Sequence, residues 1–407
     1  MMVQVVNLGE VTDMLSGFAF KSKDFLDSAS DGINLVRGDN VQQGFLRWGG
    51  KAMKWRSDAY DDFARYHLQK DDVILAMDRP IVGGGLKLAW VKEQDLPSLL
   101  VQRVTRIRGI PDKVRTNYLR YALSAPNFVA HIDRITTGAN IPHISGKDIA
   151  SFEFVLPSIT EQDRIVEFIS AYDDLIETNR RRIALLEESA RLLYREWFVN
   201  LRFPGYESAT REGTLPDGWN MQLLNEVAEV NRTSLNSKSQ PNEIQYVDIA
   251  SVETGVVLGA TKMLFAEAPG RARRLVQHGD VIWSCVRPNR RSYALMWQPD
   301  DDIVVSTGFA VLSAKSLPFS YLYFATTSDD FVAYLTNRAT GAAYPAVTAK
   351  DFEEAPLLCP KLEVLQDFHE RCLPMLELLN TLIKQNEQLT IARDALLPKL
   401  MSGAIQV

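Results

Sequence analysis

The chain has 407 residues, of which 46% are hydrophobic and 24% are charged, and its formal net charge at pH 7 is −6. This length and composition are typical of a soluble globular protein with two or three domains, and no run approaches the ~18 apolar residues of a membrane span. The acidic balance argues against a non-specific nucleic-acid binder, which is expected to be basic overall.

The sequence carries few signs of catalysis or metal binding. The three cysteines (Cys285, Cys359 and Cys372) lack a paired metal spacing, and reduced thiols in a cytoplasm are the simplest interpretation. The five histidines are isolated, so no metal site is expected. The sequence has neither the Asn-Pro-Pro-aromatic tetrapeptide of amino-methyl transfer nor a Gly-rich loop for S-adenosylmethionine. We therefore expect a non-enzymatic chain that binds no cofactor itself.

The chain contains an internal repeat of domain size. Tyr118-Leu119 recurs as Tyr321-Leu322, and a series of downstream pairs keeps the same offset. Upstream matches such as Arg79-Pro80 with Arg287-Pro288 keep the same order at a slightly larger offset. The period is far longer than a solenoid unit, so it indicates a duplicated module, and two similar modules favour a pseudo-two-fold arrangement.

Both repeats are predicted to be mixed α/β domains of the α+β class. Short β-type runs separated by Gly, Pro, Asp and Asn turns come first, followed by a helix, a Gly-containing turn and a last strand. The order of the strands in the sheets stays open. The predicted elements are strands at 73–76 and 99–104, a helix at 116–132, a turn at 138 and a strand ending at 157, then strands at 281–283 and 303–305, a helix at 318–335, a turn at 341 and a strand ending at 360.

Two stretches have the alternating three- and four-residue spacing of long helices that bury a narrow stripe against another helix. The first extends from Glu161 to Phe198, and at about 1.5 Å per residue it would be roughly 57 Å long, too long to be stable without a partner. The second starts near Leu365, and Pro374 is expected to kink it or delay its start. The predicted seam residues are Ile169, Ile176, Asn179, Ile183, Leu186, Leu193, Leu379, Leu382, Asn386, Leu389 and Leu396.

Each seam contains one asparagine, Asn179 or Asn386. A lone buried asparagine on a heptad seam lowers stability but fixes the register when it meets another polar group. Alternatively, each side chain lies at the edge of the stripe and is hydrogen-bonded to water. The sequence leaves both interpretations open.

These elements divide the chain into five segments. Residues 201–218 are the expected linker, because they contain two prolines and three glycines. The predicted boundaries are 1–158 for the first domain, 159–200 for the first long helix, 201–218 for the linker, 219–361 for the second domain and 362–407 for the second long helix.

The order of motifs resembles the specificity subunit of a type I restriction–modification system over nearly the whole chain. Thr137–Asp148 has the pattern Thr-Gly-x-x-x-Pro-x-x-Ser-x-Lys-Asp, and Glu161-Gln162 then leads into a helix that closes with Leu192–Phe198. The second repeat ends in the same way at Leu396–Gly403. It departs from the first where Lys361–Val364 stands in place of Glu161-Gln162, which leaves the start of its helix open.

This resemblance implies two target-recognition domains held apart by an antiparallel two-helix coiled coil. Each domain would read a short half-site in the major groove and the coil would set the gap, so two unlike domains imply an asymmetric bipartite target. The implied partners are double-stranded DNA, two methyltransferase subunits that carry S-adenosylmethionine and methylate a flipped adenine in each half-site, and two restriction subunits that act as motor and nuclease. The chain itself would be a cytoplasmic, non-catalytic DNA-binding subunit.

Base reading uses Arg for guanine and Asn or Gln for adenine, on loops that reach the groove. Cations cluster near predicted strands in both repeats, and the repeated Gly-to-Pro loop adds further polar residues that we expect near DNA. A solvated charge run explains any single cluster equally well, and the loop alternatively packs against the coil. The candidate DNA-binding residues are Arg47, Lys51, Lys54, Arg56, Arg79, Asn140, His143, Arg271, Arg273, Arg274, Arg287, Asn289, Arg290, Arg291 and Tyr344.

Two other functional classes stay open at this point. An accessory enzyme subunit with its own active site would need a carboxylate cluster of the Asp…Glu-x-Lys type, and no convincing one is present. A coiled-coil scaffold without a role on DNA gives no reason for two diverged mixed domains. Apolar residues expected on the outer faces of the helices, where a methyltransferase would cover them, are Leu185, Leu192, Phe198, Leu397 and Ile405.

Overall fold

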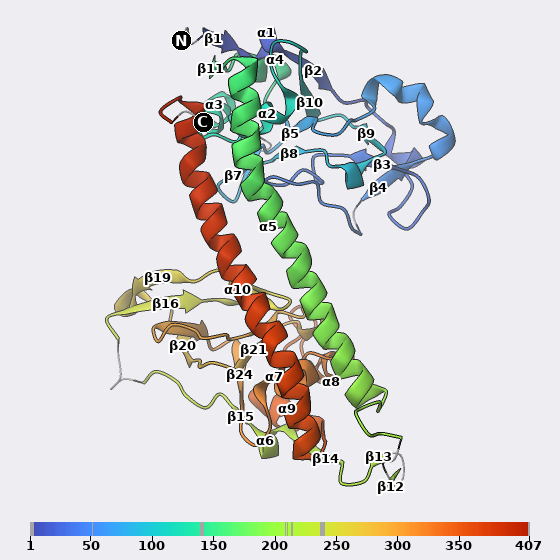
Figure 1. The fold of residues 1–407 in the computed structure, drawn as a ribbon, viewed down its shortest axis with the longest axis vertical. Helices are drawn as coiled ribbons and strands as arrows, with labels where there is room; N and C mark the ends of the chain where they lie inside the picture. The colour runs from blue at the N-terminus through green and yellow to red at the C-terminus, as the bar shows by residue number, and fades with distance from the viewer. Residues whose placement is uncertain are drawn as a thin grey trace. The chain divides into compact units, whose positions relative to one another are not determined.

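The computed structural model divides into two compact units that share the two longest helices. The structure describes residues 4–50, 52–138, 142–207, 209, 211–212, 215–236 and 241–405. Unit 1 consists of Met1–Thr178 and Asn386–Val407, and unit 2 consists of Asn179–Gln385. Helix α5 (Ile159–Tyr194) and helix α10 (Leu362–Met401) each contribute one part to each unit (Figure 1). No helix within the described residues is long and apolar enough to cross a bilayer.

Unit 1 is built on a four-stranded antiparallel sheet with the order β2-β10-β5-β8, accompanied by the sheet β4-β3-β9 and the pair β1-β11. Strand β5 is buried on both faces because its side chains alternate between two cores, with Val73 and Leu75 in one and Ile74 and Ala76 in the other. The elements are β1 Gln4–Asn7, α1 Leu8–Val11, β2 Thr12–Ser16, β3 Ile33–Val36, β4 Met53–Trp55, β5 Val73–Ala76, β6 Ile81–Val82, β7 Gly85–Leu86, β8 Leu88–Trp90, β9 Ser98–Leu100, β10 Val104–Gly109, α2 Thr116–Ala122, α3 Pro126–Ile135, α4 Gly146–Ala150 and β11 Glu153–Leu156.

Unit 2 repeats this topology, with the sheet β15-β24-β21-β22, the sheet β19-β16-β23-β20 and the pair β14-β25. Strands β16 and β23 are parallel, as β3 and β9 are in unit 1. The internal repeat is therefore a repeat of fold as well as of sequence. The elements are β12 Arg211–Glu212, β13 Leu215–Pro216, β14 Asn220–Leu223, α6 Leu224–Val227, β15 Ala228–Val230, β16 Glu243–Val247, β17 Val252–Glu253, β18 Val256–Val257, β19 Thr261–Leu264, β20 Ala272–Leu275, β21 Val281–Ser284, β22 Tyr293–Leu295, β23 Ile303–Ser306, β24 Phe309–Ala314, α7 Phe319–Thr326, α8 Asp329–Arg338, α9 Ala349–Glu353 and β25 Pro356–Cys359.

The single helices predicted at 116–132 and 318–335 are each two short helices, so that prediction was wrong. In unit 1, Pro126 occupies the first turn of α3, where its missing N–H is tolerated, and it disfavours a helical residue just before it. In unit 2, the hydroxyl of Ser328 accepts a hydrogen bond from the backbone N–H of Phe331 at 3.3 Å and caps α8. Both residues start a new helix and thereby end the previous one.

Two further predictions about single elements were also wrong. The run at 99–104 is interrupted, because β9 ends at Leu100 and Arg103 has a φ of +67° before β10 begins. Pro374 does not delay the start of α10, which begins at Leu362 and continues past the proline, and the predicted kink stays a prediction. Buried Cys372 and Leu376 flank this proline in the core of unit 2, and packing there outweighs the loss of one helical hydrogen bond.

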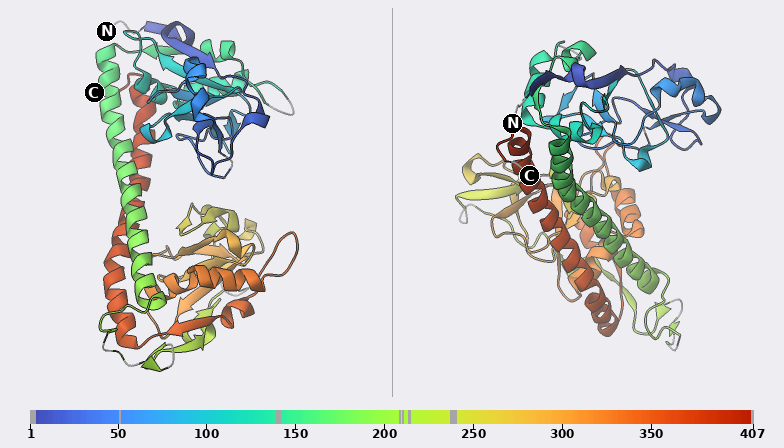
Figure 2. Two further views of the ribbon diagram at one scale, coloured as in Figure 1. Left: turned by 90° about the vertical axis from the view of Figure 1, so that its right-hand side faces the viewer. Right: turned by 45° about the horizontal axis from the view of Figure 1, so that its top comes forward.

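Within unit 1, the segments of α5 and α10 are antiparallel and lie side by side (Figure 2). Nη1 of Arg393 donates to Oδ1 of Asp173 at 2.9 Å, and Nδ2 of Asn386 donates to the carbonyl oxygen of Ile176 at 3.4 Å. Residue numbers therefore fall along α10 as they rise along α5. Aliphatic side chains of both helices join the core beside the four-stranded sheet, namely Ile165, Ile169, Leu397 and Leu400.

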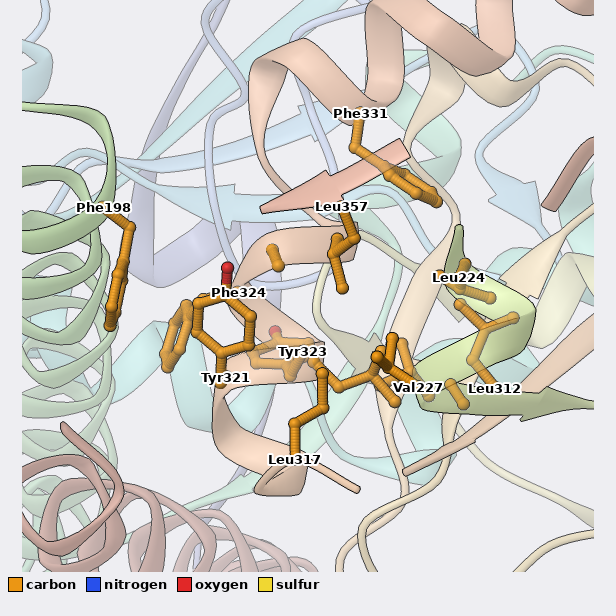
Figure 3. Packing of buried hydrophobic residues seen from close by; sticks show 14 of the residues in the cluster. Phe198, Leu224, Val227, Leu312, Leu317, Tyr321, Tyr323, Phe324, Phe331 and Leu357 are labelled. Carbon is orange, nitrogen blue, oxygen red and sulfur yellow. The ribbon is translucent and has the colours of Figure 1, made fainter. Parts of the chain in front are cut away.

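Within unit 2, aromatic rings of α10 and of the π-helical turn that follows α5 (Arg195–Val199) pack together. Phe368 of α10 is fully buried, and its ring centroid lies 5.0 Å from that of Phe198 in an edge-on contact. Figure 3 shows Phe198 beside Tyr321 and Phe324 of α7, and the centroids of Phe198 and Tyr321 are 4.8 Å apart. Such edge-on pairs stabilise a core by about 0.5–1.5 kcal/mol each beyond the apolar area that they bury.

The predicted linker is anchored where the structure describes it. Phe203 is buried, and its ring centroid lies 4.8 Å from that of Trp219. The predicted boundaries between domains, helices and linker stay predictions, because the two compact units cut both long helices rather than separating them from the sheets.

Candidate nucleic-acid interface

Each unit ties two turns together by the same backbone contacts. In unit 1, the backbone N–H of Arg79, just after β5, donates to the carbonyl oxygen of Pro142 at 2.7 Å. In unit 2, the N–H of Arg287, just after β21, donates to Pro345 at 2.6 Å. We call these joined segments the turn pair of unit 1 (78–80 with 142–143) and the turn pair of unit 2 (286–291 with 340–346). The duplication has therefore preserved one backbone arrangement in both units.

The first arginine of each turn pair has a left-handed backbone conformation. The φ angle is +47° at Arg79 and +52° at Arg287. Residues with a side chain lose about 1–2 kcal/mol in this region, which glycine would avoid. Strained positions that keep a bulky polar side chain are often functional, and both units keep arginine here.

Arg47 and Lys87 lie near Arg79 of the turn pair of unit 1. Burial lowers the pKa of the Lys87 ammonium, the charges of Asp39 and Asp78 raise it, and those of Arg79 and Arg47 lower it again. The predicted residues Arg47 and Arg79, far apart in sequence, are therefore close enough to act on the same ammonium group. Lys87 was not predicted from the sequence. Its position just after the short β6–β7 hairpin, which begins just after Arg79, could have indicated that the two residues are neighbours.

An ion cluster distinguishes the turn pair of unit 1. Nδ1 of His143 lies 2.6 Å from Oδ1 of Asp78, and Nη1 of Arg103 lies 3.7 Å from the same oxygen. At the equivalent backbone bridge of unit 2, the two residues are Val286 and Ala346. The two turn pairs therefore share a backbone but present different chemistry.

The turn pair of unit 2 brings together residues from both predicted loops. The guanidinium carbon of Arg287 lies 4.5 Å from the ring centroid of Tyr344, and Nη2 of Arg287 donates to the carbonyl oxygen of Ala343 at 3.1 Å. Tyr344 itself is 69% exposed. A cation held over an exposed aromatic ring is a surface suited to stacking or to hydrogen bonding with a base.

Three other polar side chains lie on the same turn: Arg291 has an ionic partner, and Asn289 and Arg290 do not within the described residues. Arg291 forms an ion pair with Asp329 of α8. Asn289 and Arg290 are exposed on the short 3-10 turn Pro288–Arg290, and in the part of the chain that the structure describes their side chains make no hydrogen bond or ion pair. Arg290 and Asn289 are therefore available to a partner.

The structure does not bring the other predicted cations into the turn pairs. In unit 2, Nε of Arg271 donates to the hydroxyl of Tyr246 at 3.1 Å, and Arg273 lies 4.9 Å from the ring centroid of Phe265. Burial lowers the pKa of Arg274, which the nearby Cys285 raises in part. These three arginines therefore interact with residues in and around the sheet β19-β16-β23-β20 rather than with the turn pair.

In unit 1, two predicted lysine and arginine side chains serve local contacts. Nζ of Lys54 donates to the carbonyl oxygen of Ser30 at 2.8 Å, and Nε of Arg56 lies 3.6 Å from Asp58. Lys51 and Asn140, which were also predicted to bind DNA, lie outside the described residues.

The predicted seam residues of the long helices are all buried or half-buried. Asn179 is fully buried, and its Nδ2 donates to Oε1 of Gln385 at 2.9 Å. Asn386 contacts the backbone of Ile176 as described above. These contacts favour the register interpretation over asparagines bonded only to water. Sequence reasoning did not identify Gln385, because it lies one position beside the seam.

The prediction of an apolar outer face was correct for three of its five residues. Leu185, Leu192 and Ile405 are exposed, with 68%, 38% and 37% of their surface accessible. Phe198 and Leu397 are buried, so the prediction was wrong for them. Both side chains enter the cores where each helix packs on its sheet domain, which the heptad pattern alone did not resolve.

The described residues contain no group of three or more His, Cys, Asp and Glu side chains arranged to hold a metal ion. The candidate surface is thus a set of arginines, a tyrosine and a histidine on turns. Such groups can bind phosphate oxygens and base edges directly.

Comparison with known proteins shows which proteins the chain resembles. Residues 2–188 match the model of the type I restriction modification DNA specificity domain. The chain is 36% identical to the type I restriction enzyme EcoAI specificity subunit of Escherichia coli over 171 residues, which are 42% of this chain and 28% of that protein. It is 29% identical to the MjaVIII specificity subunit of Methanocaldococcus jannaschii over 187 residues, 46% of this chain and 43% of that protein.

These two alignments each span less than half the length of the relative. A structural match covers far more, since the crystal structure of the type I restriction–modification S subunit from M. genitalium aligns with a TM-score of 0.58 over 98% of this chain and 96% of that one. Its sequence identity is 15%, so this likeness concerns the fold. By its sequence matches, the chain is similar to type I restriction–modification specificity subunits, and its residues 2–188 match their DNA specificity domain.

Proposed function

We propose that the chain reads an asymmetric bipartite DNA target, one half-site with each unit, and directs the other subunits of a type I restriction–modification complex to it. In this proposal residues 1–158 and 219–361 are the target-recognition domains. Residues 159–200 and 362–407 form the spacer between the half-sites, and residues 201–218 are the linker.

The observation that carries this proposal is the pair of unlike turn pairs on one repeated backbone. Matching backbone contacts, from Arg79 to Pro142 and from Arg287 to Pro345, present the two sets of side chains in the same way. The side chains differ, since Asp78 and His143 stand where unit 2 has Val286 and Ala346. Two readers with one geometry and different chemistry suit a target with two unlike halves.

In this proposal some polar side chains read bases, and others position the domain by contacting phosphates. Arginine recognises guanine through two parallel hydrogen bonds, and asparagine recognises adenine in a similar way. Arg290 and Asn289 are exposed and unengaged within the described residues, which suits them to base contact. Arg47 and Lys87 suit phosphate contact, because most protein–DNA contacts are made to the backbone. The net charge of −6 leaves much of the affinity for DNA to partner subunits.

Exposed apolar side chains on the long helices support docking of methyltransferase subunits. Leu185 and Leu192 lie seven residues apart on α5 and are 68% and 38% exposed, and Ile391 of α10 is 70% exposed. Side chains seven apart share one helix face, and an apolar stripe of this kind suits a protein partner. Two methyltransferase subunits that carry S-adenosylmethionine and two restriction subunits complete the proposed assembly, in which this chain performs no catalytic step.

Methylation mapping tests the proposal. In cells that express the chain with its own methyltransferase subunits, Arg290→Ala should relax discrimination at one position of one half-site, with a loss of about 1–3 kcal/mol at that base pair. Lys262→Ala is the matched control, because Lys262 is an exposed cation of the same unit that pairs with Glu243 at 3.0 Å. Unchanged base preference and unchanged methylation in Arg290→Ala would remove this turn pair from the interface.

A further inference from the structure

We propose that a largely buried charged cluster in unit 1 fixes the position of the first domain on the long helices and so sets the distance at which its half-site is read. The cluster consists of Arg120 and Tyr121 of α2, Asp173 of α5 and Arg393 of α10, and we call it the Asp173 cluster. This inference deepens the proposed function and rests on it. These four are positioning residues, because they act through the domain rather than by touching DNA.

Asp173 is the centre of the cluster. Its Oδ1 accepts from Nη1 of Arg393 at 2.9 Å, and its Oδ2 accepts from the hydroxyl of Tyr121 at 2.8 Å. Nη2 of Arg120 lies 3.9 Å from the same Oδ2 and also donates to the Tyr121 hydroxyl. The side chains of Asp173, Arg393 and Arg120 are only 18%, 27% and 13% exposed.

The sheet domain reaches the cluster from a second side. The guanidinium carbon of Arg120 lies 5.3 Å from the ring centroid of Trp90, at the end of β8. The cluster therefore joins the sheet, helix α2 and both long helices within unit 1. Burial also raises the pKa of the Tyr121 hydroxyl, so that this group keeps the proton that it donates to Asp173.

Contacts of this kind fix position more sharply than the apolar core beside them. Aliphatic side chains such as Ile165 and Leu397 tolerate small shifts, because dispersion attraction has no preferred direction. A shift by one helical residue, about 1.5 Å along the axis, would break hydrogen bonds of 2.8 and 2.9 Å to Asp173. Arg393 would keep its ion pair with Asp394 at 2.8 Å, but the Asp173 carboxylate would lose its partners in a largely buried site, which is strongly disfavoured.

The second unit has no equivalent cluster among its described residues. By the repeat, Tyr323 and Phe324 of α7 stand where unit 1 has Arg120 and Tyr121. The cation that α5 presents there is Arg191, whose guanidinium nitrogens lie 3.4 Å from the hydroxyls of Tyr293 and Thr327. These are long contacts to neutral groups, and the carboxylate whose charge acts on Arg191, Glu187, lies on the same helix rather than on the sheet domain. The charged fixation is thus a property of the first domain, and its loss should affect spacing rather than base preference.

The experiment measures which half-site spacings the complete complex methylates. Two variants, Asp173→Asn and Tyr121→Phe, remove the charge or one hydrogen bond without removing volume. The control is Arg115→Ala, since Arg115 also joins the domain to α5, through Asp163 at 2.9 Å, but with both side chains about half exposed. Genome-wide methylation is mapped in cells that express each variant with the methyltransferase subunits of its own system.

We expect Asp173→Asn to methylate sites with both half-sites intact but a gap longer or shorter by one base pair, at least tenfold more often than the unaltered protein. Tyr121→Phe should give a smaller increase, and Arg115→Ala should keep a single gap. A single gap in both cluster variants, with normal methylation, would overturn the inference. A change in the preferred bases instead of the gap would overturn it as well.

A double variant separates positioning from simple stability. Asp173→Arg with Arg393→Asp restores an ion pair between α5 and α10 but places a cation at position 173 opposite Arg120. If the cluster positions the domain, thermal stability returns and the relaxed gap persists; if the cluster only holds the helices together, both return to normal. Should the unaltered protein direct methylation to no bipartite sequence at all, the proposed function fails, which is distinct from every outcome above.

Discussion

The two units place different side chains on the same backbone, and the difference separates what the fold needs from what can diverge. In both, the strand before the arginine turn is buried on two faces, and the turn is tied to the Gly-to-Pro loop by the same N–H to carbonyl contact. At the backbone bridge between the two segments of each turn pair, unit 1 has Asp78 and His143, and unit 2 has Val286 and Ala346. Backbone hydrogen bonds and apolar cores hold the fold, which leaves the exposed turn residues free to vary.

The two units also differ in the surroundings of a buried carboxylate that directly precedes strand β5 in unit 1 and strand β21 in unit 2. Asp72 accepts from Nε and Nη2 of Arg108 at 2.6 and 2.7 Å and from the N–H of Gln69 at 2.7 Å. Its equivalent, Asp280, accepts from a backbone N–H at 2.7 Å, but the nearest guanidinium nitrogen, on Arg232, is 3.9 Å away. In unit 1, Arg108 neutralises the carboxylate of Asp72 through two hydrogen bonds. In unit 2, Arg232 is too far from Asp280 to form such a hydrogen bond.

The largest effect on stability is expected when the Asp72–Arg108 ion pair is broken. Asp72→Asn should lower the free energy of unfolding by about 3–5 kcal/mol, because it leaves Arg108 without its buried counter-charge. Urea unfolding of the complete complex, followed by tryptophan fluorescence, measures this. A loss below about 1 kcal/mol would mean that the ion pair contributes as little as a surface pair does.

A smaller effect on recognition should divide between the two halves of the target. Arg79→Ala should relax the half-site read by unit 1, and Arg287→Ala the other, each by about 1–3 kcal/mol at one base pair if the arginine reads a base. Methylation mapping of both variants shows which half changes. If either variant alters both halves, or both alter the same half, the idea of one reader in each unit is wrong.

The smallest effect is opposite in sign to that at Asp72. Burial raises the pKa of Asp280 above 3.8, and hydrogen bonds and Arg232 only partly lower it again. A carboxyl with a raised pKa in the folded state favours folding while it is protonated, and this contribution is lost as the pH rises through that pKa. Asp280→Asn should therefore gain stability relative to the unaltered protein as the pH rises from acid to neutral. Unfolding free energies measured across that range, with Asp72→Asn as the comparison, check the sign.

Sequence reasoning identified the features that follow from period and repetition. The duplication was predicted from recurring motifs, the mixed α/β class from short β-type runs and turns, and the two long helices from heptad spacing, and the structure confirms them. Heptad spacing indicates which residues face a neighbouring helix, but it does not reveal where each helix packs on a sheet. For that reason Phe198 and Leu397 were assigned to the outer face although they are buried.

The candidate site was less accessible to sequence reasoning, because it depends on contacts between distant segments. Arg79 and Arg287 were identified from the repeat, yet Lys87 acquires its place only when the β6–β7 hairpin folds back beside Arg79. The Asp173 cluster combines residues of three helices, and none of its members stands out by composition or spacing. Short-range signals such as Pro126 were present in the sequence and were outweighed by the apolar pattern around them.

The central claim is that this chain alone determines a target with two unlike halves at a fixed distance. Genome-wide methylation sequencing, in cells that carry the methyltransferase subunits with and without this chain, tests it most directly. We predict methylated adenines in two different short sequences separated by one constant gap, only when the chain is present. Methylation that persists without the chain, or a target that is continuous or has two identical halves, would contradict the account.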